Sequence, residues 1–139
     1  MDGERDINTP PGPANDPRGT ILVVEDEQLM LRLLKRSLSN RGYEVFTAAD
    51  GEQAIELYHV HKQDIDVVLL DIGLPKIGGA DVFIKMKEEN PDVRVVVASG
   101  YLDPEVKAEM FQGGVKHFFS KPYIFQDIIN AFEKLMAAR

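Results

Sequence analysis

Residues 67–71 read Val-Val-Leu-Leu-Asp, four consecutive large apolar residues that end in an acid. A short run that is apolar at every position is typical of a strand buried on both faces of a parallel sheet. The run Ile21–Val24 has the same character and is followed by two acids, Glu25 and Asp26. Two buried strands that each lead into carboxylates predict an α/β protein whose chemistry lies at one edge of its sheet.

The rest of the chain alternates strand and helix patterns. Three more strands are expected, at Glu44–Ala48, Val93–Ala98 and His117–Ser120. The expected helices are Glu27–Asn40, a helix capped by Asp50 that runs to about His61, Ala80–Asn90, Pro104–Gln112 and Phe125–Ala137. Glycine after the first helix and proline at the start of the fourth are typical boundary signals. Five strands alternating with five helices predict an open parallel sheet covered on both faces.

Residues 1–19 differ from the remainder of the chain. They contain four prolines and three glycines, and Met1 and Ile7 are their only large apolar residues. Such a stretch cannot bury enough apolar surface to offset the entropy lost on ordering. We therefore expect a disordered tail or linker over residues 1–19 and one domain over residues 20–139. That length leaves no room for an additional DNA-binding or enzymatic effector domain in this chain.

Composition restricts the classes of partner. The net charge is −7, and no cluster of Lys and Arg stands out from the acidic background, which argues against direct nucleic-acid binding. The apolar runs are much shorter than the roughly 20 residues that cross a bilayer. The N-terminus lacks the apolar segment of a signal peptide. The chain has no cysteine, which excludes disulfides and thiolate sites, and we expect a cytoplasmic location.

Polar side chains follow four of the five expected strands. Glu25 and Asp26 follow the first, Asp71 the third, Ser99 the fourth and Lys121 the fifth. Three carboxylates at one edge favour Mg²⁺ or Mn²⁺. A lysine and a hydroxyl beside them supply the positive charge and the hydrogen-bond donor that a phosphoryl oxyanion needs. Because a carboxylate so placed can act as a nucleophile, the set predicts an aspartyl phosphate.

Each of these residues also has an ordinary structural interpretation when taken alone. Glu25 and Asp26 could cap the following helix, since acids stabilise a helix N-terminus. Ser99 alone would be read as a turn hydroxyl, Lys121 as a surface charge and Phe118 as a core residue. The site interpretation depends on the whole set occurring together.

Four segments, in this order and spacing, resemble the response-regulator receiver domain of two-component signal transduction. They are Ile21–Glu27, Val67–Pro75 with Gly78 and Gly79, Val97–Gly100, and Phe118–Pro122. The resemblance covers about residues 20–138 and implies a flavodoxin-like, doubly wound fold with strand order 2-1-3-4-5. It also implies a phosphoacceptor rather than an enzyme. A histidine kinase or histidine phosphotransfer protein would be the donor, and the output would be altered contacts with a downstream protein.

The resemblance assigns a metal site around Asp71, the phosphoacceptor. Asp26, Asp71 and the backbone carbonyl of Gly73 would bind Mg²⁺ directly, and Glu25 would act through a bound water. These assignments come from the family pattern and not from spacing alone.

The resemblance also assigns the residues that respond to the phosphoryl group. Lys121 would pair with the phosphate, and its bond to Pro122 is expected to be cis. Ser99 would be the switch hydroxyl, and Phe118 the aromatic side chain whose rotamer is coupled to it. The face formed by the fourth helix, fifth strand and fifth helix, around Lys107, Phe118 and Tyr123, would then be the switching surface.

Two positions depart from the common family pattern. Gly73, two residues beyond the phosphoacceptor, lacks the polar side chain often found there, and Tyr101, two residues beyond Ser99, is bulky. We hypothesise that the missing side chain and the shielding by Tyr101 make autodephosphorylation slow.

Three alternatives remain open at this stage. The chain could be the receiver portion of a hybrid sensor histidine kinase, which the Ser99-Gly100-Tyr101 string and the Pro-rich lead-in favour. It could be a receiver-like scaffold that is never phosphorylated. It could also be a phosphohydrolase resembling the haloacid dehalogenases, although that family has a second Asp where this chain has Gly73, and its nucleophile follows the first strand.

Overall fold

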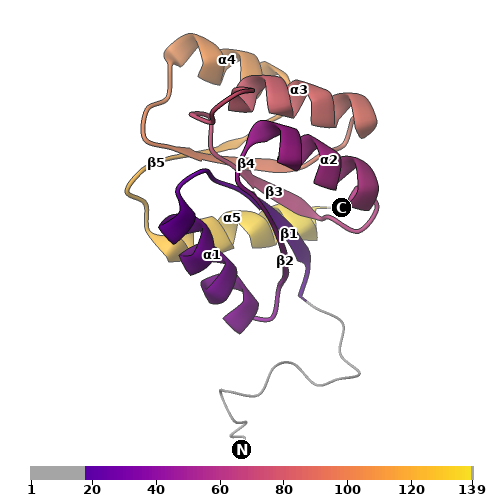
Figure 1. The fold of residues 1–139 in the computed structure, drawn as a ribbon, viewed down its shortest axis with the longest axis vertical. Coiled ribbons are helices and arrows are strands. Elements are labelled where there is room, and N and C mark those ends of the chain that lie inside the picture. Colours follow the sequence, from indigo (N-terminus) through magenta and orange to yellow (C-terminus); the bar gives the residue numbers. More distant parts are fainter. Residues whose placement is uncertain (1–17, 139) are drawn as a thin grey trace, which may run out of the picture.

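The computed structural model describes residues 18–138, which form a five-stranded sheet covered by helices on both faces (Figure 1). All strand pairs are parallel, and the order is β2-β1-β3-β4-β5, as expected. The strands are β1 (Thr20–Val24), β2 (Glu44–Ala48), β3 (Val67–Leu70), β4 (Val95–Ser99) and β5 (His117–Ser120). The helices are α1 (Gln28–Asn40), α2 (Gly51–His61), α3 (Gly79–Glu89), α4 (Pro104–Gln112) and α5 (Phe125–Ala137).

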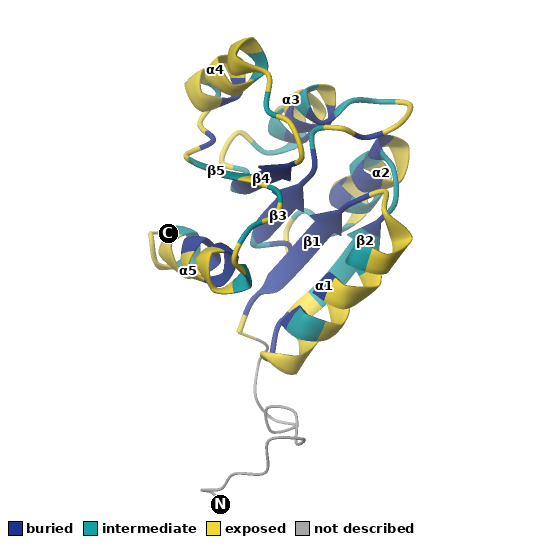
Figure 2. Ribbon diagram, turned by 90° about the vertical axis from the view of Figure 1, so that its left-hand side faces the viewer, coloured by how far each residue is buried: buried dark blue, intermediate teal, exposed yellow. Residues whose placement is uncertain are grey.

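Two apolar clusters fill the space between the sheet and its helices. Alternate residues of β1 point to opposite faces: Leu22 belongs to the cluster under α2, α3 and α4, and Val23 to the cluster under α1 and α5. Every residue of β1, β3 and β4 is buried, which Figure 2 shows as a dark centre to the sheet. This burial on both faces explains why these strands read as continuous apolar runs.

The local boundary signals act as the sequence predicted. The Asp50 side chain accepts a hydrogen bond of 2.8 Å from the backbone N–H of Gln53 and so caps α2. Gly42 has a φ of 95° just beyond α1, a conformation that favours glycine. Pro104 opens α4.

Three boundaries differ from the prediction. The fourth strand begins at Val95 rather than Val93, because Val93 donates its N–H to the carbonyl of Asn90 in a turn, and the strand continues to Ser99. Helix α1 begins at Gln28 with Glu27 as its N-cap residue. Helix α3 begins one residue earlier than expected, at Gly79, and ends at Glu89.

Gly79 lies where the chain passes closest to the loop after β3. A Cβ atom at this position would lie 2.6 Å from the carbonyl oxygen of Asp71 and from the Cα of Ile72. The Gly79 N–H also donates to the Ile72 carbonyl at 2.9 Å. The glycine therefore permits a backbone approach that holds the loop following Asp71 against the start of α3.

The predicted tail falls largely on residues 1–17, which lie outside the described residues. Arg18 and Gly19, which were predicted to belong to that tail, contact the domain. The Arg18 N–H donates to the Gly42 carbonyl at 2.9 Å, and its guanidinium donates to Glu133 at 2.8 Å. Within residues 18–138, none of the helices combines the length and the apolar content needed to cross a bilayer.

Candidate functional site

The carboxyl ends of β1, β3, β4 and β5 meet at one edge of the sheet and border an open pocket. Its lining includes all the strand-end residues that the sequence predicted to meet: Glu25, Asp26, Asp71, Ser99 and Lys121. Gly73 and Tyr101, the two positions that depart from the family pattern, line it as well. This position, outside the carboxyl ends of parallel strands, is where open α/β sheets bind their ligands.

Three carboxylates form the acidic part of the pocket. One oxygen each of Glu25, Asp26 and Asp71 lies within 4.8 Å of the others. Sheet register produces this meeting, because Val24 of β1 pairs with Leu70 of β3 and the next residue on each strand is an acid. Glu25 and Asp71 are only 3% and 7% exposed, whereas Asp26 faces solvent. Like charges held this closely need a cation beside them.

Lys121 supplies the positive charge from the loop after β5. Its Nζ donates hydrogen bonds to Oε1 of Glu25 at 2.6 Å and to Oδ2 of Asp71 at 3.1 Å. Burial lowers the pKa of Lys121, but its bonds to Glu25 and Asp71 outweigh that effect and leave the pKa raised. The ammonium therefore stays protonated at neutral pH. The Lys121–Pro122 peptide bond is cis, as the resemblance implied.

Backbone N–H groups orient the two buried carboxylates. The Gly73 N–H donates to Oδ1 of Asp71 at 3.0 Å, and the Glu27 N–H donates to Oε2 of Glu25 at 3.0 Å. Each carboxylate thus has one oxygen held by its own loop and the other by Lys121. A Cβ atom at Gly73 would lie 3.8 Å from Oδ1 of Asp71, which is an ordinary contact. The pocket therefore has room for a side chain at position 73.

Ser99 is buried beside the acids, but its hydroxyl bonds elsewhere. Its Oγ donates to the backbone carbonyl of Tyr101 at 3.1 Å. The Tyr101 side chain is 75% exposed and lies on the pocket rim. Phe118 does not line this pocket; it lies half-buried on β5, with the Lys107 ammonium of α4 5.4 Å from its ring centre.

Asp103, which was not predicted as a site residue from the sequence, also lines the pocket. Its carboxylate accepts a hydrogen bond of 2.9 Å from the Glu105 N–H and caps α4. An acid directly before a proline that opens a helix is a recognisable N-cap signal. That signal could have identified Asp103 as the residue that joins the pocket rim to α4.

Comparison with known families matches residues 21–133 to the response regulator receiver domain. The chain belongs to this family. It is 31% identical over 116 residues to sporulation initiation phosphotransferase F of Bacillus subtilis, covering 84% of this chain and 92% of that protein. It is 34% identical over 103 residues to a cyclic di-GMP phosphodiesterase of Thermotoga maritima. That match covers 74% of this chain but only 27% of the phosphodiesterase, so the matched segment is a small part of that protein's length.

Solved receiver structures share the fold. The complex of CheX with CheY, BeF₃ and Mg²⁺ from Borrelia burgdorferi contains a chain that superposes on this one with a TM-score of 0.78 and 27% identity. The match covers 84% of this chain and 88% of that chain.

The haloacid-dehalogenase alternative does not hold, because Asp71 follows β3 of a receiver sheet rather than the first strand.

Proposed function

We propose that this receiver domain accepts a phosphoryl group on Asp71 in a Mg²⁺-dependent reaction and signals through altered protein contacts. The donor would be a histidine kinase or a histidine phosphotransfer protein. The observation that carries the proposal is the arrangement around Asp71. Its carboxylate lies within 4.8 Å of two other acids, and its Oδ2 is 3.1 Å from a lysine ammonium.

The residues at the pocket fit a hard divalent cation. Three carboxylates and one ammonium leave an excess of two negative charges, and all the nearby ligand atoms are oxygens. Asp26, Asp71 and the Gly73 carbonyl would hold the ion, and Glu25 would contact it through water. When bound, Mg²⁺ would neutralise charge on the phosphoryl oxygens.

In the proposed transfer, an Asp71 carboxylate oxygen attacks the phosphorus of a phosphohistidine. The bond between phosphorus and nitrogen breaks, and its electron pair returns to the imidazole, which leaves the site. Lys121 offsets the negative charge that the phosphoryl group brings to Asp71. Positioning and charge neutralisation supply most of the acceleration in such reactions.

The hydroxyl of Ser99 links this chemistry to a surface. To donate to a phosphoryl oxygen it must leave the Tyr101 carbonyl, which changes the loop that leads to Asp103 and α4. We infer that the face around Lys107, Phe118 and Tyr123 is the switching surface. Adding beryllofluoride with Mg²⁺ should shift the amide NMR signals of these residues, and unchanged signals there would refute this assignment.

The receiver portion of a hybrid sensor histidine kinase remains the second candidate. The Ser99-Gly100-Tyr101 string and the Pro-rich lead-in favour it. An immunoblot of native cells with an antibody against this domain would separate the two, since a hybrid kinase appears as a much longer polypeptide.

The cytoplasmic location expected from the lack of cysteine stays a prediction.

Phosphorylation of the purified chain tests the main proposal. Incubation with phosphoramidate and Mg²⁺ should add the mass of one phosphoryl group, and peptide mapping should place it on Asp71. Chelating the metal, or the substitution Asp71→Asn, should abolish labelling. Asp103→Asn is the matched control, because Asp103 borders the same pocket and should leave labelling intact. Equal labelling of the Asp71→Asn variant would overturn the proposal.

A further inference from the structure

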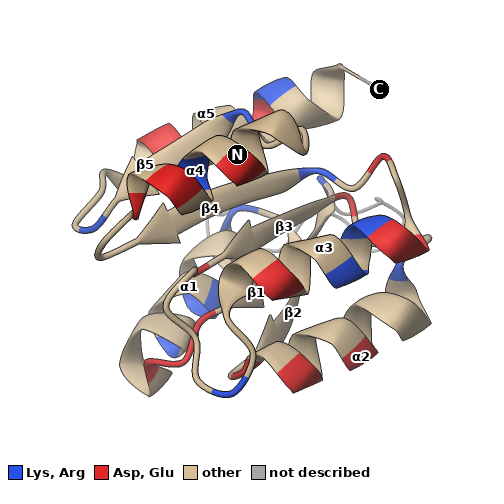
Figure 3. Ribbon diagram, turned by 90° about the horizontal axis from the view of Figure 1, so that it is seen from above, with Lys and Arg blue, Asp and Glu red and all other residues tan. Residues whose placement is uncertain are grey.

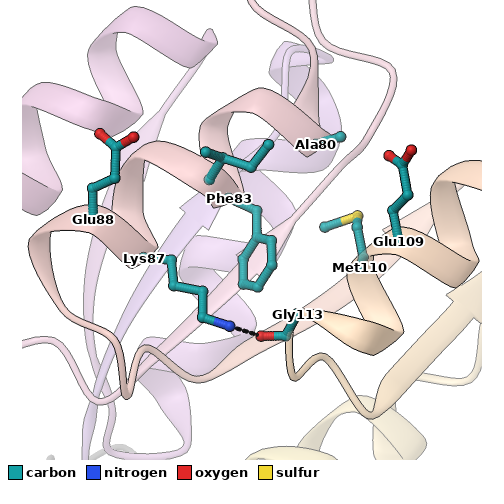
Figure 4. Close-up of a pocket in the computed structure, with 8 residues that line it drawn as sticks. Ala80, Phe83, Lys87, Glu88, Glu109, Met110 and Gly113 are labelled. Carbon is teal, nitrogen blue, oxygen red and sulfur yellow. Dashed lines mark hydrogen bonds between the residues drawn. The ribbon is translucent and has the colours of Figure 1, made fainter.

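An open groove runs between α3 and α4, separate from the pocket at Asp71 (Figure 4). We call it the α3–α4 groove. The residues that line it are Ala80, Phe83, Ile84, Lys87, Glu88, Glu109, Met110 and Gly113. None of these residues lines the phosphoacceptor pocket. The groove therefore offers a surface on which a ligand could bind without covering the site of phosphorylation.

The floor of the groove is apolar and firmly packed. Phe83 and Met110 are 4% and 2% exposed and belong to the core cluster under α2, α3 and α4. Gly113 lies so close to Phe83 that an added Cβ atom would be 2.8 Å from its ring. Ile84, on the α3 wall, is in contrast 52% exposed. Covering Ile84 would remove apolar surface from water, which favours binding of an apolar group.

The charges on the walls are mainly negative. Glu88 on α3 and Glu109 on α4 lie on opposite sides of the groove (Figure 4). Glu109 has no side-chain partner among residues 18–138, and Glu88 has a 3.9 Å contact with exposed Lys85. Lys87 is the cation in the lining, but its ammonium donates to the Gly113 carbonyl and lies 5.8 Å from the Phe83 ring centre. Its charge is thus directed to one end of the groove.

We propose that the α3–α4 groove binds a basic, amphipathic polypeptide segment of a partner protein. An apolar side chain of the segment covers Ile84 and contacts Phe83 and Met110, as in other helix-in-groove complexes. Lys or Arg residues one helical turn away pair with Glu88 and Glu109. Red ribbon segments in Figure 3 mark acidic residues on α3 and α4, and the whole chain carries a net charge of −7. The same excess of acid disfavours a second copy of this chain as the occupant.

Designed peptides provide the test. One probe is an amphipathic helical peptide with Leu at one face and Lys at flanking positions; its matched counterpart carries Glu in place of each Lys. Binding to the full chain is followed by amide NMR shifts and by titration calorimetry at low salt. The Lys peptide should shift the signals of Ile84, Glu88 and Glu109, and the Glu peptide should not.

Variants of the groove separate its apolar and charged parts. Ile84→Ser should lower the affinity for the Lys peptide about tenfold. Glu88→Gln and Glu109→Gln should each lower that affinity by about twofold to fivefold. Glu56→Gln, which neutralises an exposed acid on α2, is the control and should change nothing. The double charge reversal Glu88→Lys with Glu109→Lys should transfer binding to the Glu peptide. Circular dichroism confirms that each variant is folded.

Three results would overturn the proposal. The first is equal binding of the Lys and Glu peptides, and the second is an affinity insensitive to all groove variants. The third is self-association of the chain that Ile84→Ser abolishes, which would make the groove a contact between copies. The test does not depend on phosphorylation, so it stands apart from the proposed role of Asp71.

Discussion

Lys121 lies 2.6 Å from Glu25, closer than to Asp71, the proposed phosphoacceptor, at 3.1 Å. Lys121 and Glu25 are 96 positions apart in the chain and follow the ends of β5 and β1. In this state the lysine therefore donates hydrogen bonds to both buried carboxylates at once. A phosphoryl group on Asp71 or a divalent cation beside Glu25 would change the hydrogen bonds that Lys121 makes. The contact between Lys121 and Glu25 should therefore respond to both ligands.

The substitution Lys121→Met should therefore raise the affinity for Mg²⁺ by about tenfold, because it removes a competing cation from the acids. It should also lower the free energy of unfolding without metal by about 3 kcal/mol, since two buried carboxylates lose their partner. Titration calorimetry measures the first effect, and urea unfolding with and without Mg²⁺ measures the second. Lys107→Met, on α4 and outside the pocket, should change neither. An unaltered Mg²⁺ affinity would mean that Lys121 does not compete with the cation.

Gly73 should limit the rate of dephosphorylation. An Asn at this position has room beside Asp71 and can orient a water molecule, so Gly73→Asn should speed the loss of the phosphoryl group on the order of tenfold. Gly73→Ala adds the Cβ atom alone and should leave the rate near that of the natural chain. Tyr101→Glu tests the shielding by Tyr101 in the same assay, which follows the decay of the labelled chain. Identical decay rates in all variants would disprove the hypothesis.

His117 should make stability depend on pH. Burial, and then the charges of Lys134 and Lys116, lower its pKa from the ordinary value of 6.5. The unfolded chain therefore binds a proton at a higher pH than the folded chain does. The stability linked to His117 is complete above pH 6.5 and is lost as the pH falls through the lower, folded pKa.

Urea unfolding midpoints between neutral and mildly acidic pH measure this dependence. His117→Gln should flatten the curve below the ordinary histidine pKa. Lys134→Met removes one source of repulsion and should narrow the affected pH range. A curve that is unchanged in both variants would show that other groups cause the loss of stability.

Gly79→Ala should disturb the loop after Asp71. The new Cβ atom would meet the carbonyl of Asp71 at 2.6 Å, so backbone must move, and we expect a loss of about 1–3 kcal/mol in the free energy of unfolding. Gly78→Ala is a close control, because a Cβ atom there has no neighbour within 4 Å. Thermal unfolding compares the two variants, and equal stabilities would contradict the packing at Gly79.

Much of the fold could be predicted from residue order. A strand buried on both faces must be apolar at every position, so Ile21–Val24 and Val67–Leu70 identify themselves without knowledge of their neighbours. The acids that follow these strands indicate the site, because parallel strands end at a common edge. The start of β4 was less predictable, since Val93 is apolar but its N–H is used in a turn closed by Asn90.

The amino-acid order determined which groups would gather at the edge of the sheet, because strand periodicity is a local property that each segment carries in its own residues. Only the tertiary structure decided how those groups pair: Lys121 with Glu25 as well as Asp71, and Ser99 with the Tyr101 carbonyl. It also brought Ile84 and Glu88 opposite Glu109 across the α3–α4 groove. Such pairings depend on distances between remote segments, and these distances exist only after the helices have packed on the sheet.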